Sequence, residues 1–290
     1  MAKFKIITDS SANLTDEIIN KYQIPILSLS FIVNDVAYKS YENGRVTELK
    51  MYYEMMREKE HVSTSCVNGD EAYTICNKIL KDGEDILYIG FSSKLSNTYN
   101  VVRLELESLQ KKYPDRKILY IDSLAASLGQ GMIVATACQM RESGKTIDEI
   151  YIWVEKNKLK ACHLFTVNTL YHLLKGGRVN KVSYLISNVL DIKPIMHVDM
   201  EGRLIAIGKT IGRKRSLNNL VDRLVDSILN PEEQTIYISH GDSLEDALYC
   251  KKRISERINV KDFVINYVDL VVGAHSGPGT IAIFYYGEHR

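Results

Sequence analysis

Cysteine and long apolar runs are scarce in this sequence, and each scarcity excludes a class of protein. The 290 residues include 5 cysteines and 5 prolines. The cysteines are widely spread and form no C-x-x-C pair, so we expect reduced thiols, a cytoplasmic location and no structural zinc. No apolar run approaches the roughly 20 residues that span a bilayer. Only two apolar residues separate Lys5 from Asp9, so we expect no signal peptide.

A charge bias is also missing. The chain has 37 Lys and Arg against 36 Asp and Glu, a formal net charge of +1. Nothing in this balance favours nucleic acid or an acidic membrane as partner. The histidines show no H-E-x-x-H or similar spacing, so no metal site is expected.

What is present is a globular composition and a regular alternation of elements. Apolar segments such as Phe4–Thr8, Ile86–Phe91 and Lys117–Ile121 alternate with helical segments, which predicts a parallel sheet covered on both faces. After about residue 160, hairpin and crossover connections mix. We therefore predict an α/β fold with two domains: residues 1–158 as three layers around a parallel sheet, and residues 159–290 as an α/β domain with a mixed sheet. Further helices are expected from Thr47 through Met56 and over Val179–Leu190.

One histidine lies among small residues in the segment V-V-G-A-H-S-G-P-G-T, Val271–Thr280. Glycine, alanine and serine neighbours leave little bulk near His275, so a ligand or another backbone can come close. A β-branched and aromatic run, Thr280–Tyr286, predicts a strand directly after this loop. Two interpretations have equal weight: His275 is a fixed donor to a ligand, or it satisfies a backbone group in a tight turn.

Two loops rich in hydroxyl groups accompany this histidine. Ser63–Ser65 precedes a helix capped by Asn68, while Ser92, Ser93 and Ser96 follow the strand that ends at Phe91. Both loops are expected at strand carboxyl ends and helix N-termini, where an open α/β sheet binds ligands and anions. Plain helix capping explains either loop alone. Together with His275 they favour an anion site, because a buried carboxylate needs several donors.

Three weaker signals leave alternatives open. Gly90–Lys94 is similar to a nucleophile elbow that lacks its second glycine, a weak case for a hydrolase with Ser92, Asp122 or Asp242, and His275. Gly131–Ala137 is a run of small residues, typical of close helix packing or of the border of an apolar channel. A basic cluster is either solvated surface or a docking patch for an acidic or phosphate-bearing partner. Its members are Lys209, Arg213, Lys214, Arg215, Lys175, Arg178 and Lys181. It has too few aromatic neighbours to favour nucleic acid.

Seven segments carry a resemblance to a known family. They are T-D-S-S at Thr8–Ser11, the loop Ser63–Asn68, L-S-N-T-Y at Leu95–Tyr99, D-S…G-Q-G at Asp122–Gly131, L-L-K-G-G-R at Leu173–Arg178, K-P-I at Lys193–Ile195 and G-A-H-S-G-P-G-T at Gly273–Thr280. Jointly they resemble the DegV family, the fatty-acid-binding (FakB) subunits of bacterial fatty acid kinase.

The resemblance implies a carrier rather than a catalyst. A long-chain fatty acid would lie between the two domains, presented to a separate ATP-dependent kinase subunit (FakA) and released as acyl phosphate for phospholipid synthesis. No cofactor other than this ligand, no nucleic acid and no transmembrane segment are implied, and transient membrane contact is allowed. The implied carboxylate ligands are Thr64, Ser96 and His275, with Ser65, Thr98 and Ser276 in support. The implied docking position for the kinase is Arg213, with Lys214 beside it.

Two segments depart from the family pattern. Cys66, Val67 and Asn68 replace the usual Q-P-S, which frees the loop from proline. Asn97 replaces a glycine, and we expect it to tolerate a left-handed backbone. The alternatives are a serine esterase that uses Ser92 or Ser96 with His275, and a protein that only binds partners.

Overall fold

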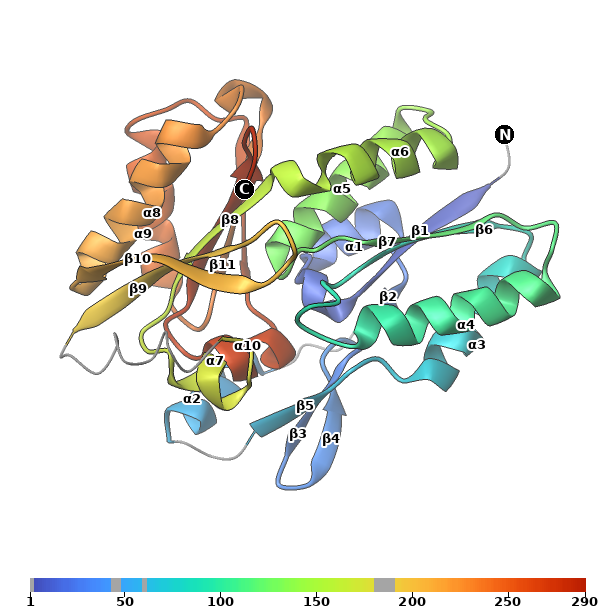
Figure 1. Cartoon of the computed structure of the whole chain (residues 1–290), viewed down its shortest axis with the longest axis horizontal. Coiled ribbons are helices and arrows are strands. Elements are labelled where there is room, and N and C mark those ends of the chain that lie inside the picture. The colour runs from blue at the N-terminus through green and yellow to red at the C-terminus, as the bar shows by residue number, and fades with distance from the viewer. Residues whose placement is uncertain (1–2, 43–47, 59–61, 180–190) are drawn as a thin grey trace.

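The structure is a computed structural model that describes residues 3–42, 48–58, 62–179 and 191–290. Two sheets lie side by side, each covered by helices (Figure 1). Residues 180–190 of the helix expected over Val179–Leu190 lie outside the described residues, and so does Thr47, which was expected to start another helix. Within the described part, that other helix is α2 (Leu49–Arg57).

The first sheet is parallel and has helices on both faces, as predicted. Its strand order is β2 (Ile26–Leu27), β1 (Phe4–Asp9), β6 (Asp85–Gly90) and β7 (Ile118–Asp122). Successive residues of a strand face opposite sides, so Ile6 and Ile7 enter different cores. One face packs against α3 (Gly69–Lys81) and α4 (Thr98–Lys112), and the other against α1 (Asp16–Tyr22), α5 (Leu128–Glu142) and α6 (Ile147–Asn157).

The second sheet is mixed, which is also as predicted. Its strand order is β10 (Leu204–Ile211), β9 (Ile192–Val198), β8 (Ala161–Thr166), β13 (Ile281–Tyr286), β11 (Thr235–His240) and β12 (Asp262–Tyr267). Only β11 and β12 pair in parallel. The helices α8 (Arg213–Ser227) and α9 (Leu244–Ser255) cover one face. The predicted boundary at residues 158 and 159 falls within a short 3-10 helix, Lys158–Lys160, and the division into two domains stays a prediction.

Helix α5 packs against both sheets, and its small residues make this possible. It contacts β1 and β6 of the first sheet and β8, β11 and β13 of the second. A Cβ at Gly129 would lie 2.2 Å from His163 Nε2, and one at Gly131 would lie 2.5 Å from the carbonyl oxygen of Ala12. The small-residue run is therefore a site of close packing.

A third, antiparallel sheet corrects two expectations. The apolar run Ile26–Val33 predicts a single strand, but it is divided. Its first part, β2, joins the first sheet, while β3 (Ser30–Val33) pairs with β4 (Val36–Lys39) and β5 (Val62–Ser65). Ser63–Ser65 is thus a strand rather than a loop, because β3 gives it a partner about 30 residues away in the chain. Asn34-Asp35 is a pair that predicts a hairpin turn, and it forms one between β3 and β4, with positive φ at both residues.

Side chains cap the N-termini of some of the helices. Asn68 caps α3 as expected, and Thr146 and Glu149, whose spacing predicts a capping box, form one on α6. Asn13 is a residue type that predicts a cap for α1, but it ends a 3-10 turn with a φ of 51°, and the cap of α1 is Thr15. Within the described residues, no helix is both long and apolar enough to cross a membrane.

Candidate functional site

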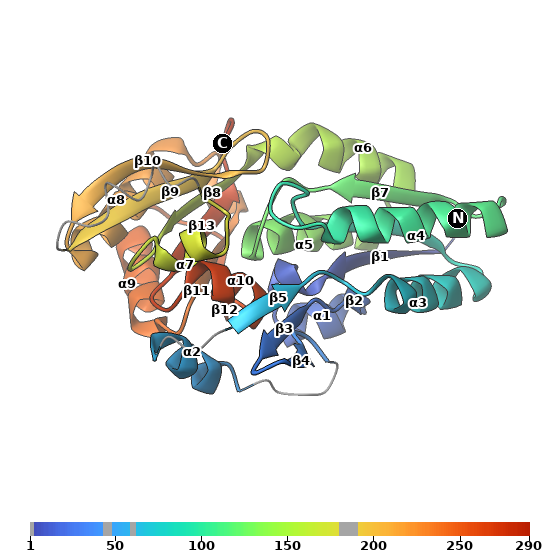
Figure 2. The ribbon, with the colours of Figure 1, turned by 60° about the horizontal axis from the view of Figure 1, so that its bottom comes forward.

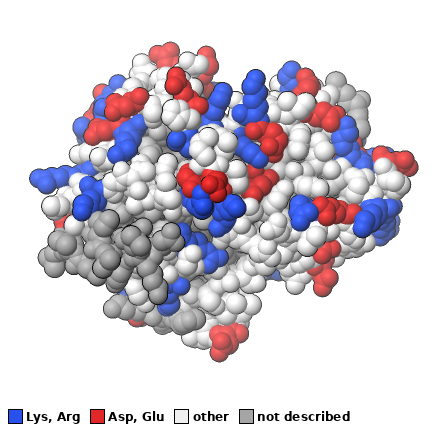
Figure 3. Space-filling model, viewed as in Figure 1, with Lys and Arg blue, Asp and Glu red and all other residues white. Residues whose placement is uncertain are grey.

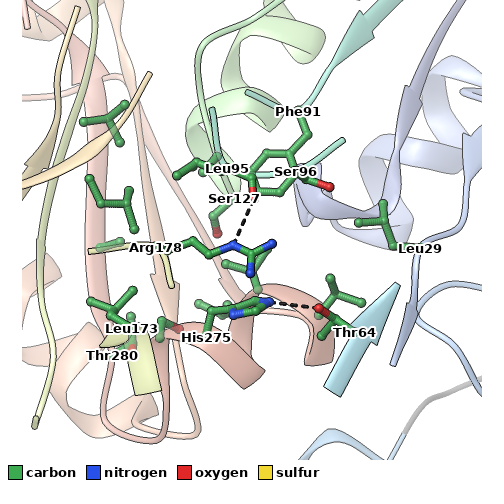
Figure 4. Close-up of a pocket in the computed structure, with 18 of the residues that line it drawn as sticks. Leu29, Thr64, Phe91, Leu95, Ser96, Ser127, Leu173, Arg178, His275 and Thr280 are labelled. Carbon is green, nitrogen blue, oxygen red and sulfur yellow. Dashed lines mark hydrogen bonds between the residues drawn. The ribbon is translucent and has the colours of Figure 1, made fainter. Parts of the chain in front are cut away.

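A cavity of about 380 Å³ lies where the two sheets meet. Its wall is mostly apolar, with Phe91 and Leu95 from the first half of the chain and Phe165, Leu204 and Phe284 from the second. Several polar side chains line it as well: Thr64, Ser65, Cys66, Ser96, Asn97, Ser127, His163, Arg178, His275, Ser276 and Thr280. Figure 4 shows Thr64, Arg178 and His275 close together in this cavity. A long apolar ligand with one polar end suits such a lining.

His275 and Thr64 meet across the cavity. Thr64 Oγ1 and His275 Nε2 are 2.9 Å apart and hydrogen-bonded (Figure 4). His275 was expected in a loop, but it lies in the last turn of α10 (Leu270–Ser276). The expectation failed because Asp269 caps this helix: its carboxylate accepts a hydrogen bond from Val272 N and another from the hydroxyl of Ser40. This cap starts a helix although the segment contains glycine.

Glycines allow the close approach that places the imidazole. A Cβ at Gly176 would lie 2.1 Å from His275 Nδ1, and one at Gly273 would lie 2.4 Å from the hydroxyl of Tyr53. Gly176 ends the short helix α7 (Tyr171–Lys175), so α7 and α10 pack directly against each other. The glycine that makes room for the imidazole is therefore Gly176, from another part of the chain, whereas Gly273 of the predicted segment makes room for Tyr53.

Burial lowers the pKa of His275 to about 4, and the positive charge of Arg178 acts in the same direction. The imidazole is thus neutral at pH 7. Its Nδ1 is buried without a hydrogen-bond partner among the described residues, and so is Ser276 Oγ. A neutral imidazole positions Thr64 without adding charge to the cavity.

Ser96 reaches the cavity from the N-terminus of α4. Its Oγ lies 3.0 Å from Thr98 Oγ1 and accepts a hydrogen bond from Thr98 N at 3.2 Å. Thr98 is fully buried, and its Oγ1 also accepts from Val67 N at 3.5 Å, so it supports Ser96 and the loop after β5. Asn97 has a right-handed backbone with a φ of −76°, so the expectation of a left-handed residue there is wrong. The turn does not require glycine.

Arg178 lines the cavity, whereas its place among basic residues predicts a position in the surface basic cluster. It is the only Lys or Arg among the described lining residues. Its Nε donates to the carbonyl oxygen of Leu95 at 2.9 Å, and Nη1 donates to that of Gly176. Burial lowers its pKa. The sequence signal that could have placed Arg178 in the cavity is its position at the end of L-L-K-G-G-R, one of the segments that carry the family resemblance.

The hydrolase alternative does not assemble around Ser92. This side chain is fully buried, does not line the cavity, and donates to the carbonyl oxygen of Gly202 at 2.8 Å. Asp122 accepts from the backbone N–H groups of Ser93 and Leu124 instead of orienting a histidine. Ser96 bonds Thr98, and the hydroxyl partner of His275 is Thr64.

Comparison with known proteins identifies the family. The family model described as an uncharacterised protein of the DegV family matches residues 3–288. This chain belongs to the DegV family. A DegV domain-containing protein of Clostridium perfringens is 43% identical over 290 residues, covering 100% of this chain and 99% of that protein.

Solved DegV structures share the fold. A DegV lipid binding protein from Thermotoga maritima is 26% identical, with a TM-score of 0.85 and 99% of each chain covered. The fatty acid kinase B3 protein of Streptococcus pneumoniae, loaded with linoleic acid, is 20% identical, with a TM-score of 0.85 and coverage of 99% of this chain and 100% of that one.

Arg213 of this DegV chain has partners within the chain. It begins α8, bonds the carboxylate of Asp246 through Nε and Nη2 at 2.9 and 2.7 Å, and donates from Nη2 to the carbonyl oxygen of Gly279 at 2.6 Å. It therefore holds the loop that follows α10. Lys209, Lys214 and Arg215 are exposed. Positive and negative side chains are interspersed on the face shown in Figure 3. Docking at Arg213 and Lys214 stays a prediction.

Proposed function

We propose that this DegV protein binds a long-chain fatty acid in the cavity and presents its carboxylate to a separate ATP-dependent kinase subunit, which forms the acyl phosphate. The observation that carries the proposal is one cavity with an apolar wall in which Thr64, Ser96, Arg178 and His275 supply polar groups. Two relatives support it: one is described as lipid-binding, and the other is a fatty acid kinase B protein loaded with linoleic acid.

The acyl chain supplies most of the affinity. Burial of a C16 chain at about 0.8 kcal/mol per CH₂ contributes roughly 10 kcal/mol before the costs of binding. The head group then has to avoid the penalty of an unpaired buried charge.

The polar groups divide this task. Arg178 supplies the positive charge, because His275 is neutral at pH 7. With the proton of the imidazole on Nε2, His275 donates to Thr64 Oγ1 and leaves the Thr64 hydroxyl proton free to donate to the carboxylate. Ser96 Oγ is a second hydroxyl donor, held in place by Thr98. His275 thus orients a donor, and the carboxylate faces Arg178.

Two measurements test the proposal. Native mass spectrometry of the purified protein, followed by organic extraction, should reveal one fatty acid per chain. Delipidated protein reloaded with palmitate should yield acyl phosphate, trapped as the hydroxamate, when a fatty acid kinase catalytic subunit and ATP are added. The substitution Thr64→Val should reduce acyl phosphate formation more than palmitate binding, because the tail dominates affinity. Protein that neither carries nor takes up fatty acid contradicts the proposal.

A further inference from the structure

The turn between β9 and β10 reaches from the second sheet to the first (Figure 1). It is stiffened internally, because Asp199 Oδ1 accepts from the N–H groups of Glu201 and Arg203, both at 2.9 Å. The residues on either side of this tip, Val198 and Leu204, line the cavity. Leu204 also packs against the small cluster of Phe91, Leu95 and Ala126. The position of the tip therefore sets the position of one wall of the cavity.

Ser92 holds this tip from the loop after β6. Its Oγ donates to the carbonyl oxygen of Gly202 at 2.8 Å. Gly202 has a φ of +84°, and a Cβ there would lie 2.4 Å from Ser92 Oγ and 3.1 Å from Leu124 Cβ. The tip is thus seated tightly on the loops that follow β6 and β7, and only glycine fits the contact.

Arg290 holds the same tip from another side. Its guanidinium donates hydrogen bonds to five backbone carbonyl oxygens, and it makes no ion pair among the described residues. The acceptors are Asp199 at 3.2 Å, Lys158 at 3.1 Å, Ala161 at 2.9 Å, Ser123 at 3.4 Å and Leu124. One side chain therefore ties the hairpin to the loop after β7, next to Ala126 and Ser127 of the cavity wall.

We propose that Ser92 and Arg290 are positioning residues for acyl-chain selection: they fix the β9–β10 tip so that Val198 and Leu204 form a closed wall against the acyl chain. The inference rests on the proposed binding of a fatty acid. A tip released from either residue moves away from the loops after β6 and β7, which enlarges the cavity beside Leu204. Longer chains then gain relative to shorter ones.

The test is a competition between acids of different length. Delipidated protein is incubated with equal amounts of myristate, palmitate and stearate, and the bound ratio is read by native mass spectrometry. We expect Ser92→Ala, which removes one hydrogen bond to the tip, to raise the stearate-to-myristate ratio about two- to ten-fold. Arg290→Met, which removes five hydrogen bonds, should raise it at least as much. Ser93→Ala is the matched control and should keep the wild-type ratio, because Ser93 does not line the cavity and lies outside the contact with Gly202.

A second pair of variants tests the contact itself. Gly202→Ala should raise the ratio as well, because its new Cβ meets Ser92 Oγ. In the double variant Ser92→Ala/Gly202→Ala, the increment due to Gly202→Ala should be smaller than in the wild-type background, since that oxygen is gone.

The possible outcomes separate the two proposals. Wild-type protein that takes up no acid overturns the proposed function, and the inference falls with it. Wild-type and variant proteins that each bind one acid with the same ratio overturn the inference alone. A lower melting temperature with a uniform loss of all three acids assigns Ser92 and Arg290 a structural role only, and also overturns it. If Ser92→Ala or Arg290→Met does not fold, Gly202→Ala, which disturbs the same contact from the other side, takes its place: a raised stearate-to-myristate ratio supports the inference, and an unchanged ratio overturns it.

Discussion

Replacement of Arg178 tests how the cavity tolerates a charged head group. Arg178→Met keeps a long apolar side chain but removes the only positive charge among the described lining residues. His275 does not compensate at pH 7, because burial lowers its pKa to about 4. We therefore expect the variant to bind a fatty acid anion much more weakly than the wild-type protein does.

The magnitude follows from the contacts that remain. Thr64 and Ser96 still donate neutral hydrogen bonds, so the loss is that of a charge-assisted contact, about 1.5–3 kcal/mol. Since 1.4 kcal/mol corresponds to tenfold in affinity, palmitate binding should weaken by about 10- to 100-fold. A neutral ligand of the same length, hexadecanol, needs no counter-charge. Its affinity should change by less than about threefold.

Displacement of a fluorescent fatty acid at pH 7.5 measures both ligands on wild-type and variant protein. Arg178 also bonds the carbonyl oxygens of Leu95 and Gly176, so the alcohol reports any collapse of the wall that these residues support. Equal losses for the acid and the alcohol would refute the assignment and leave Arg178 a purely structural role. An unchanged affinity for both would refute its place at the head group.

Three further predictions concern stability and docking. The folded pKa of His275, about 4, lies below its ordinary value near 6.5, so folding favours the neutral imidazole. The resulting contribution to the free energy of unfolding is on the order of 3 kcal/mol. It is complete above about pH 6.5 and is lost as pH falls through 4. Urea unfolding of delipidated protein should accordingly show a flatter pH dependence between 4 and 6.5 for His275→Gln, and parallel profiles would contradict the burial argument. Gly129→Ala should lower stability by about 1–3 kcal/mol because its Cβ meets His163, while Gly208→Ala, whose Cβ would meet nothing nearer than 3.7 Å, serves as the control in the same melting experiment. Arg213→Ala should reduce acyl phosphate formation by a kinase subunit at least tenfold with palmitate binding kept within threefold, and a loss of both in equal measure would assign Arg213 to the loop at Gly279 rather than to docking.

The sheets were predictable because their signal is local. Continuous apolar strands between helices indicated a covered parallel sheet, and the change of pattern near residue 160 indicated the mixed sheet. The helix caps at Asn68 and Thr146 were also predictable, because a cap depends on only a few neighbouring residues. Two hydroxyl-rich segments and a histidine among small residues indicated an anion site, and the family resemblance then singled out Thr64, Ser96 and His275. All three line the cavity.

The failures share a physical cause, which is contact between distant parts of the chain. Ser63–Ser65 is polar and short, and it is a strand only because β3 pairs with it. His275 lies on a helix because Asp269 caps it and Ser40 holds Asp269. Arg178 looked like surface charge because the sequence does not show that α7 packs against α10. In each case tertiary contact overrode the local pattern.

Ser92 shows how such contact changes the meaning of a motif. In the sequence it follows a strand, faces a predicted helix and is similar to a nucleophile. In the structure its hydroxyl proton is donated to the carbonyl oxygen of Gly202, and neither His275 nor the cavity is within its contacts. A nucleophile needs a base at hydrogen-bond distance, whereas a hydroxyl that joins two loops needs only an acceptor. If the cavity binds a fatty acid, the same serine acts on it through the wall formed by Leu204, and chain-length selection, rather than hydrolysis, is the property that its replacement should change.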